Sequence, residues 1–231
     1  MIIGKCLKCN GELKHSDHLV FAKCTECGVE EKTYIQCENG HYYCNTCASK
    51  SVINKLYKMV PLISQKNPCE IAEMLFVECG ICGNSPHPLT TAAFLIAYKN
   101  LTGKITDNDV YEGIDRALKI PGGWCGYYGN CGAAVGLGVA FAIINKSTPM
   151  SDEERNIANI ATAEGLLSVA DQGGPRCCTA SVRRVLEKSI EVANTYLNVS
   201  FPLYEHEMKP CWQSKYNDVC RHNKCKYFKG V

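Results

Sequence analysis

The sequence predicts a mainly helical protein, in which a small zinc-ribbon-like module with short β-hairpins precedes an all-helical cysteine-rich domain. Seven of the 17 cysteines lie before residue 50, in a stretch without helical periodicity. From about residue 51 apolar side chains recur at helical spacing, and no segment there alternates as a strand would. We therefore expect a zinc-binding module over 1–50, a helical cysteine-rich domain over 51–203 and a cysteine-containing metal-binding tail over 204–231.

The composition excludes several classes of protein. With 231 residues, 46% of them hydrophobic and 21% charged, the chain is long and apolar enough to bury a core. A net charge of +2 argues against a strongly polyanion-binding surface. Residues 131–144, the longest weakly polar stretch, are too few to span a bilayer, and the start lacks the apolar core of a signal peptide. We therefore expect a cytoplasmic protein without a membrane partner, whose cysteines are metal ligands or reactive thiols rather than disulfides.

The cysteines of the first 50 residues have the spacing of metal ligands. Two Cys-x-x-Cys pairs, each followed closely by a glycine, are separated by 14 residues, as in a zinc ribbon. This first set comprises Cys6, Cys9, Cys24 and Cys27. The second set comprises Cys37, His41, Cys44 and Cys47. We expect two sequential sites of four ligands each, which hold structural zinc.

A different pairing of these ligands is also open. The ligands from Cys24 to Cys47 resemble the first six of a RING finger, and Cys79 and Cys82 could supply the last pair. A cross-braced arrangement would follow. This interpretation leaves the first cysteine pair without a metal and places a helix-containing segment inside the site, so we favour the sequential sites.

The helices of the main domain follow from periodicity and from the residues that end them. They are expected over 48–59, 69–78 and 90–100, from Thr106 to Pro121, from Cys131 onward, from Ser151 to Gly173, and from Cys177 to Leu197. In the fourth of these, Val110, Ile114 and Ala117 share one face. Ser151 and Glu154 have the spacing of a capping box at the start of the sixth. Glycine and proline residues separate the helices.

Two glycine-rich breaks place cysteines at helix starts. Cys131 follows the glycines of residues 122–129, and Cys177 and Cys178 follow Gly173-Gly174-Pro175. Unpaired N–H groups and the helix dipole favour a thiolate at such a position. The small residues after Cys131 permit close helix packing, either within the domain or in a dimer.

These cysteines predict a sulfur-based centre. We expect Cys131 and Cys177 to lie together as ligands of an iron–sulfur cluster, with further ligands from Cys79, Cys82 and Cys125. Cys178 is the candidate nucleophile, because Arg176 beside it should lower its pKa and stabilise its thiolate or an anionic substrate. His87, held between two prolines, is a candidate general acid or ligand, or a loop histidine without a chemical role.

The tail carries one more set of possible ligands. Cys211, Cys220 and Cys225 could bind a metal with His206 or His222 as the fourth ligand. Aromatic side chains lie among six basic residues of the tail, a mixture that could bind RNA, although the excess of positive charge is small.

Several of these motifs together resemble a known family. They are Cys37-Glu-Asn-Gly-His41-Tyr-Tyr-Cys44-Asn-Thr-Cys47, Cys79-Gly-Ile-Cys82, the glycine-rich 122–138 segment, Gly174-Pro-Arg-Cys177-Cys178 and Cys225. The chain resembles, over nearly its whole length, an uncharacterised cysteine-rich domain family of archaea and anaerobic bacteria. Some members look to be fused to a methyltransferase, which implies a methyltransferase partner. The chain itself has no glycine-rich S-adenosylmethionine loop after a strand. Separately, Cys131-Gly-Ala-Ala-Val-Gly136 is similar to the Cys-Gly-Ala-x-x-Gly segment of a group of redox proteins, which are named for a cysteine, a Gly-Cys-Ala step and later cysteines.

Two functions remain open at this point. The first is an enzyme: a metalloprotein with structural zinc and an iron–sulfur or thiol centre, which acts in redox or sulfur transfer with a redox protein or a methyltransferase as partner. The second is an adaptor in which every site holds structural zinc and the protein binds another enzyme or RNA.

Overall fold

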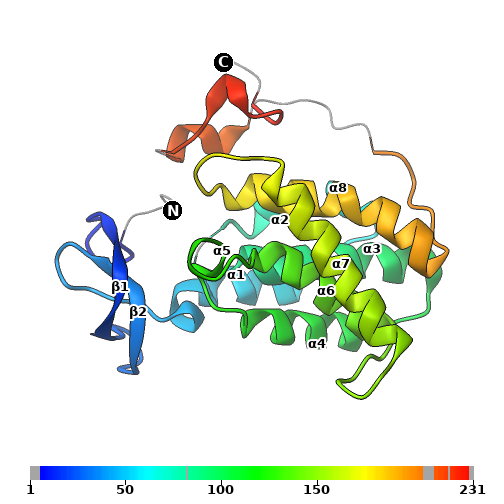
Figure 1. Ribbon diagram of the computed structural model, residues 1–231, viewed down its shortest axis with the longest axis horizontal. Coiled ribbons are helices and arrows are strands. Elements are labelled where there is room, and N and C mark those ends of the chain that lie inside the picture. The colour runs from blue at the N-terminus through cyan, green and yellow to red at the C-terminus, as the bar shows by residue number, and fades with distance from the viewer. Residues whose placement is uncertain (1–5, 82, 205–210, 218, 229–231) are drawn as a thin grey trace.

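The fold is that of a computed structural model, which describes residues 6–81, 83–204, 211–217 and 219–228. The described parts of the chain form one hairpin, eight α-helices and two short 3-10 helices (Figure 1). In chain order they are β1 (Leu13–Lys23), β2 (Glu30–Cys37), α1 (Asn45–Met59), α2 (Pro68–Glu78), α3 (Pro86–Thr102), α4 (Asp107–Leu118), α5 (Trp124–Tyr127), α6 (Gly132–Ile144), α7 (Glu153–Ala170), α8 (Cys178–Leu197), η1 (Trp212–Tyr216) and η2 (His222–Lys224). The predicted fold class is confirmed: a small antiparallel β-hairpin precedes a mainly helical protein. No described helix has both the length and the apolar character that crossing a membrane requires.

The helix starts show where local sequence rules were sufficient and where they were not. Helix α3 begins at Pro86, four residues before its predicted start, because a proline fits the first turn of a helix, where its missing N–H costs nothing. The predicted capping box of Ser151 and Glu154 is wrong. Asp152 is the N-cap of α7 and makes no side-chain cap bond. The Ser151 hydroxyl instead accepts a hydrogen bond from the Thr148 backbone N–H at 3.0 Å.

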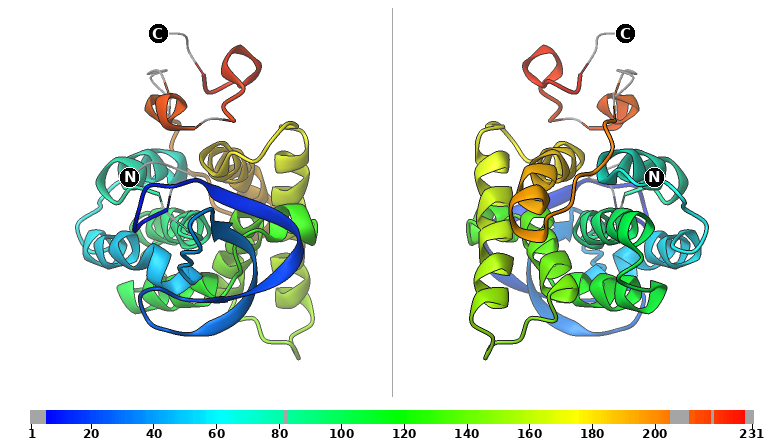
Figure 2. Two further views of the ribbon diagram at one scale, coloured as in Figure 1. Left: turned by 90° about the vertical axis from the view of Figure 1, so that its left-hand side faces the viewer. Right: turned by 90° about the vertical axis from the view of Figure 1, so that its right-hand side faces the viewer.

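Helix α3 forms the centre of the core. Every residue from Leu89 to Tyr98 is buried, and α2, α4, α6 and α8 pack around this helix (Figure 2). The Phe94 ring stacks on Phe141 of α6 with the ring centroids 5.1 Å apart and meets Phe201 edge-on at 5.6 Å. Burial of so much apolar surface stabilises the helical domain without any metal.

The glycines of α6 serve packing inside the domain. A methyl group on Gly136 would lie 2.7 Å from the His87 carbonyl oxygen of α3. On the other side, a methyl group on Gly138 would overlap the Thr162 hydroxyl and lie 2.9 Å from the Ala158 carbonyl oxygen of α7. Helix α6 can therefore approach both neighbours closely only because these positions lack a side chain.

Three contacts join the amino-terminal module to the helical domain. Helix α1 begins directly after Cys44 and continues across residue 50, so that one rigid element belongs to both parts. Tyr34 of β2 stacks on Tyr127 of α5 with the ring centroids 3.7 Å apart. The Tyr127 hydroxyl also donates to the Ser16 carbonyl oxygen at 2.7 Å. These contacts hold the hairpin beside the glycine-rich loop of the helical domain.

Candidate functional site

The eight amino-terminal ligands form two clusters of four. The first is Cys6, Cys9, Cys37 and His41. The second is Cys24, Cys27, Cys44 and Cys47. Within each cluster all ligand atoms lie within 4.8 Å of one another. Because sulfurs at about 2.3 Å from a tetrahedral ion are about 3.8 Å apart, both clusters are compatible with zinc or another metal.

The expected pairing into sequential sites is wrong. The first Cys-x-x-Cys pair joins the third pair of ligands, and the second joins the fourth, so the two sites are cross-braced. The hairpin explains this pairing. Leu13 is opposite Cys37 in the sheet, which brings the first and third pairs of ligands together at one end. At the other end Cys24 bridges to Tyr42, beside Cys44.

The RING-like ligand set expected as the alternative is also not formed. Its cross-braced topology is present, but Cys6 and Cys9 supply the pair that Cys79 and Cys82 would have supplied. Cys79 is buried in the apolar core, outside both clusters, and burial raises its pKa to about 11. Cys82 lies outside the described residues.

Backbone and amide N–H groups point at several of these sulfurs. The Lys8 N–H donates to Cys6 at 3.4 Å and the Asn39 N–H donates to Cys37 at 3.4 Å. The Asn39 side chain lowers the pKa of Cys9 to about 6. Hydrogen bonds to a sulfur favour its charged form, which is the form that binds metal. Gly28 and Gly40 have φ angles of +76° and +77°, which let the backbone turn beneath the sulfurs.

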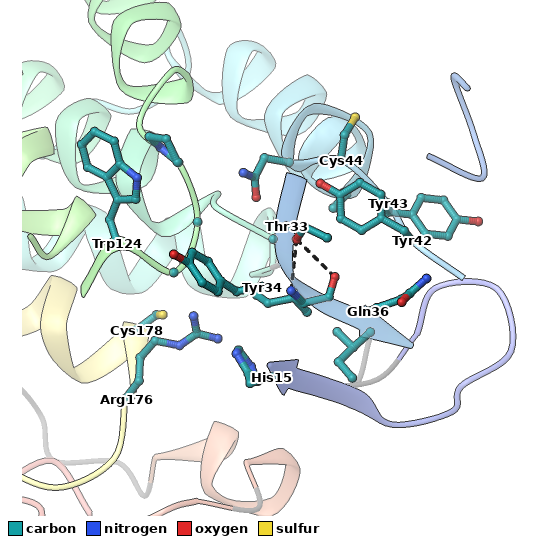
Figure 3. Close-up of a pocket in the computed structure, with 18 of the residues that line it drawn as sticks. His15, Thr33, Tyr34, Gln36, Tyr42, Tyr43, Cys44, Trp124, Arg176 and Cys178 are labelled. Atoms are coloured by element: carbon teal, nitrogen blue, oxygen red, sulfur yellow. Dashed lines mark hydrogen bonds between the residues drawn. The ribbon is translucent and has the colours of Figure 1, made fainter. Parts of the chain in front are cut away.

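A cleft of about 1470 Å³ lies between the hairpin and the helical domain (Figure 3). Its aromatic lining includes Tyr34, Trp124, Tyr127 and Tyr128. Its chemically reactive lining includes Cys125 of α5, Arg176, Cys177 and Cys178. Sequence reasoning did not identify this aromatic wall, although the run of residues 124–128 carries three of its four members.

Arg176 brings three of the cysteines into one electrostatic neighbourhood. Attraction by the Cys178 thiolate raises the pKa of Arg176, and the thiolates of Cys125 and Cys131 raise it further. Arg176 is solvent-accessible in the cleft, and among the described residues it forms no ion pair with a carboxylate. The three sulfurs come from α5, the N-cap of α6 and the first residue of α8. They do not all lie within 4.8 Å of one another, which is wider than the ligands of one tetrahedral ion.

The expected low pKa of Cys178 is wrong. Burial raises the pKa of this thiol to about 11, and the opposing attraction of Arg176 is smaller. Burial likewise raises the pKa of Cys131, although the backbone N–H groups of Ala134 and Ala133 oppose it. The helix starts do supply N–H groups, as expected. However, the free-energy cost of removing a thiolate from water is larger than the stabilisation that these N–H groups provide.

Cys131 and Cys177, expected to share one centre, have different neighbours. Burial raises the pKa of Cys177, and the thiolates of the tail raise it further, those of Cys211, Cys225 and Cys220 in this order. Around Cys131 the neighbouring thiol is that of Cys125. The two thiols thus have different electrostatic neighbours, although both act on Cys178, and their shared centre stays a prediction.

His87 is packed as a neutral imidazole. Its Nδ1 lies 3.1 Å from the Ile120 carbonyl oxygen, and its ring lies against Gly132 at the start of α6. Burial, with a smaller contribution from the positive charge of Arg176, lowers its pKa to about 4, although the hydrogen bond to Ile120 opposes this change. At neutral pH the imidazole is therefore neutral and has a single N–H, which is directed at the Ile120 carbonyl oxygen. It has no second proton to donate as a general acid.

Together these features define a cysteine-rich helical protein with two potential metal sites and a thiol-lined cleft. The chain belongs to the family of unknown function DUF5714, which matches residues 56–228. This result confirms the expected membership of an uncharacterised domain family. No curated protein and no solved structure matches the chain significantly.

Proposed function

We propose that the protein is a zinc-stabilised enzyme of redox or sulfur transfer, whose working centre is formed by Cys125, Cys131, Cys178 and Arg176. One observation carries this proposal: the thiols of Cys125 and Cys178 line the cleft beside Arg176, and Cys131, from a third segment, acts electrostatically on the same guanidinium. Cys125 and Cys178 are not part of the apolar core, whereas Cys79 is buried in it and Cys131 packs against it. Zinc in the two amino-terminal clusters has a structural role, because their ligands hold the hairpin in place.

Redox and sulfur transfer share one chemical step at this centre. The Cys178 sulfur attacks a sulfur of a substrate disulfide or persulfide, a new S–S bond forms, and the substrate S–S bond breaks. The departing sulfur takes the electron pair of the broken bond, and the proton lost by Cys178 balances its charge. A second thiol of the group completes a disulfide in the redox reaction, whereas in sulfur transfer the sulfur atom stays on Cys178.

Arg176 is placed to stabilise the charge that develops during this step. With a pKa of about 11, Cys178 is a neutral thiol at neutral pH, so negative charge arises only as the reaction proceeds. A cation fixed beside the developing charge stabilises the transition state more than the resting enzyme. The aromatic wall of the cleft provides the surface on which an apolar part of the substrate packs.

An iron–sulfur cluster is the second form that this centre could take. The three sulfurs are spaced too widely for one ion, whereas a cluster with three cysteine ligands would leave one iron open to the cleft. Purification without oxygen, followed by iron and acid-labile sulfide analysis, distinguishes the two forms. Iron that is lost in Cys131→Ser supports the cluster, and its absence supports the thiol form.

The decisive experiment compares Cys178 with Cys69. Both thiols are partly buried, but the pKa of Cys69 is raised by burial to about 12, and no arginine is among its electrostatic neighbours. In mild iodoacetamide labelling at neutral pH, Cys178 should react about tenfold faster, as the difference in pKa requires. Cys178→Ser should abolish exchange with a small disulfide, whereas Cys69→Ser should leave it unchanged. If Cys178 stays unlabelled before and after metal removal and zinc is the only metal, the adaptor function is favoured.

A further inference from the structure

The carboxy-terminal tail, meaning here the described residues 211–217 and 219–228, returns across the start of α8 (Figure 1). In its first turn, Gln213 accepts a hydrogen bond from the Thr179 hydroxyl of α8. Further along, the Arg221 guanidinium donates to the Gly173 carbonyl oxygen at 2.9 Å, in the loop that precedes α8. These contacts lie on either side of Cys177 in the chain, so the tail passes along the segment that contains this residue.

Two of the three tail cysteines, Cys211 and Cys220, have sulfurs that accept hydrogen bonds. Cys211 accepts a hydrogen bond at 3.5 Å from Arg183, one turn into α8. The thiolates of all three tail cysteines also act electrostatically on Cys177, which lies between the two points at which the tail contacts this segment. The His222 backbone N–H donates to the Cys220 sulfur at 3.5 Å. This contact, from the second residue after the cysteine, is the one that Cys6 and Cys37 make in the amino-terminal clusters.

Apolar packing does not account for the order of the tail. Among the described side chains beyond residue 203, no apolar one is buried, and Gln213 alone is, with 4% of its surface exposed. Two short 3-10 helices without a core of their own need another source of stability. Thiolates of the tail that act electrostatically on Cys177 also disfavour its ionised form, unless a cation compensates them.

We propose that Cys177, Cys211, Cys220 and Cys225 form a third metal centre, in which four thiolates bind a thiophilic metal and hold the tail against α8. The fourth ligand is thus a cysteine of the helical domain rather than a histidine. The His222 ring instead lies edge-on to Phe228 with the ring centroids 4.9 Å apart. His206, the other histidine considered for this role, lies outside the described residues.

The spacing of the four sulfurs affects whether the centre can bind a single zinc ion or an iron–sulfur cluster. They do not all lie within 4.8 Å of one another, so a single zinc ion would draw the exposed turns of the tail inward. An iron–sulfur cluster would accept a wider arrangement of the same four thiolates. Both occupants use the same ligand chemistry, and metal analysis distinguishes them.

The first test counts metals in the full chain after purification without oxygen. We expect zinc for the two amino-terminal clusters and a further metal for the tail, either a third zinc or iron with acid-labile sulfide. Cys177→Ser and Cys220→Ser should each lose only this further metal. Cys69→Ser and His222→Ala should retain it. Iron that is lost in Cys131→Ser but retained in Cys177→Ser would be bound at the cleft and not at the tail. The proposal of a centre in the cleft and the proposal of a centre in the tail can therefore be refuted independently.

The second test needs no substitution and therefore does not depend on the folding of a variant. The chelated full chain is reloaded with cadmium-113 and its NMR signals are recorded. The two amino-terminal clusters should give one signal for four sulfurs and one for three sulfurs and a nitrogen. The third centre adds a second four-sulfur signal. A single four-sulfur signal, or a Cys177→Ser protein that retains every metal, would overturn the proposal.

Discussion

Acid should destabilise the helical domain through His87. The ring is packed between α3 and the start of α6, with Nδ1 directed at the Ile120 carbonyl oxygen, and burial holds its pKa at about 4. In the unfolded chain a histidine titrates near 6.5. Between these two pKa values, His87 is protonated in the unfolded chain and neutral in the folded protein.

The direction and size of the effect follow from this difference. Because the unfolded state binds more protons, stability rises with pH through this window. The contribution of His87 is complete above about pH 6.5 and is lost as the pH falls toward 4. A pKa lowered from about 6.5 to about 4 corresponds to about 3 kcal/mol, at roughly 1.4 kcal/mol per pH unit.

The assay is urea unfolding of the wild type and of His87→Asn between pH 7 and pH 4. Asparagine keeps an N–H donor near Ile120 but does not titrate, so the variant should lose about 3 kcal/mol less on acidification. Both proteins release their metals as the thiolates are protonated, and the comparison cancels that loss. Equal pH dependence of the two unfolding free energies would refute the reasoning, because it would mean that the folded protein protonates His87 as readily as the unfolded chain.

Three further predictions concern metals and packing. A chelator should make the β1–β2 hairpin sensitive to proteases while the circular dichroism of the helical domain is retained; coincident loss of both would contradict this. Gly138→Ala should destabilise the protein by about 1–3 kcal/mol in urea unfolding, because its methyl group overlaps Thr162, whereas Gly126→Ala, which meets no atom within 4 Å, should change little. Arg183→Ala should cost about 3–5 kcal/mol, because it removes the guanidinium that donates to the Glu73 carboxylate at 2.6 and 2.8 Å in a largely buried ion pair. A smaller cost in Glu73→Gln/Arg183→Met would confirm that the loss of this ion pair is responsible.

The fold class and most helix positions could be predicted from the sequence, because both depend on local patterns. Apolar periodicity marks α4 and α8, and glycine-proline breaks mark their limits. The eight amino-terminal ligands could be identified for the same reason, since Cys-x-x-Cys is a local motif. Their pairing could not, because it depends on the register of β1 and β2, which places Leu13 opposite Cys37.

The properties of the thiol centre were harder to predict, because they depend on the tertiary surroundings. A cysteine beside Arg176 at a helix start has every local feature of a low pKa, yet burial outweighs these features at Cys178. The neighbours of Cys177 come from the tail, which lies more than thirty residues further along the chain. Spacing rules apply within a motif and contain no information about such contacts.

The segment before α8 connects the two proposed centres. Arg176, Cys177 and Cys178 all line the cleft, and the thiolates of the tail also act electrostatically on Cys177. A metal that holds Cys177 would therefore also hold the backbone on which Arg176 is placed. In Cys220→Ser, where Cys178 and Arg176 are both intact, the rate of disulfide exchange should fall although the nucleophile is unchanged. An unchanged rate together with loss of the tail metal would show that the third centre is structural for the tail alone.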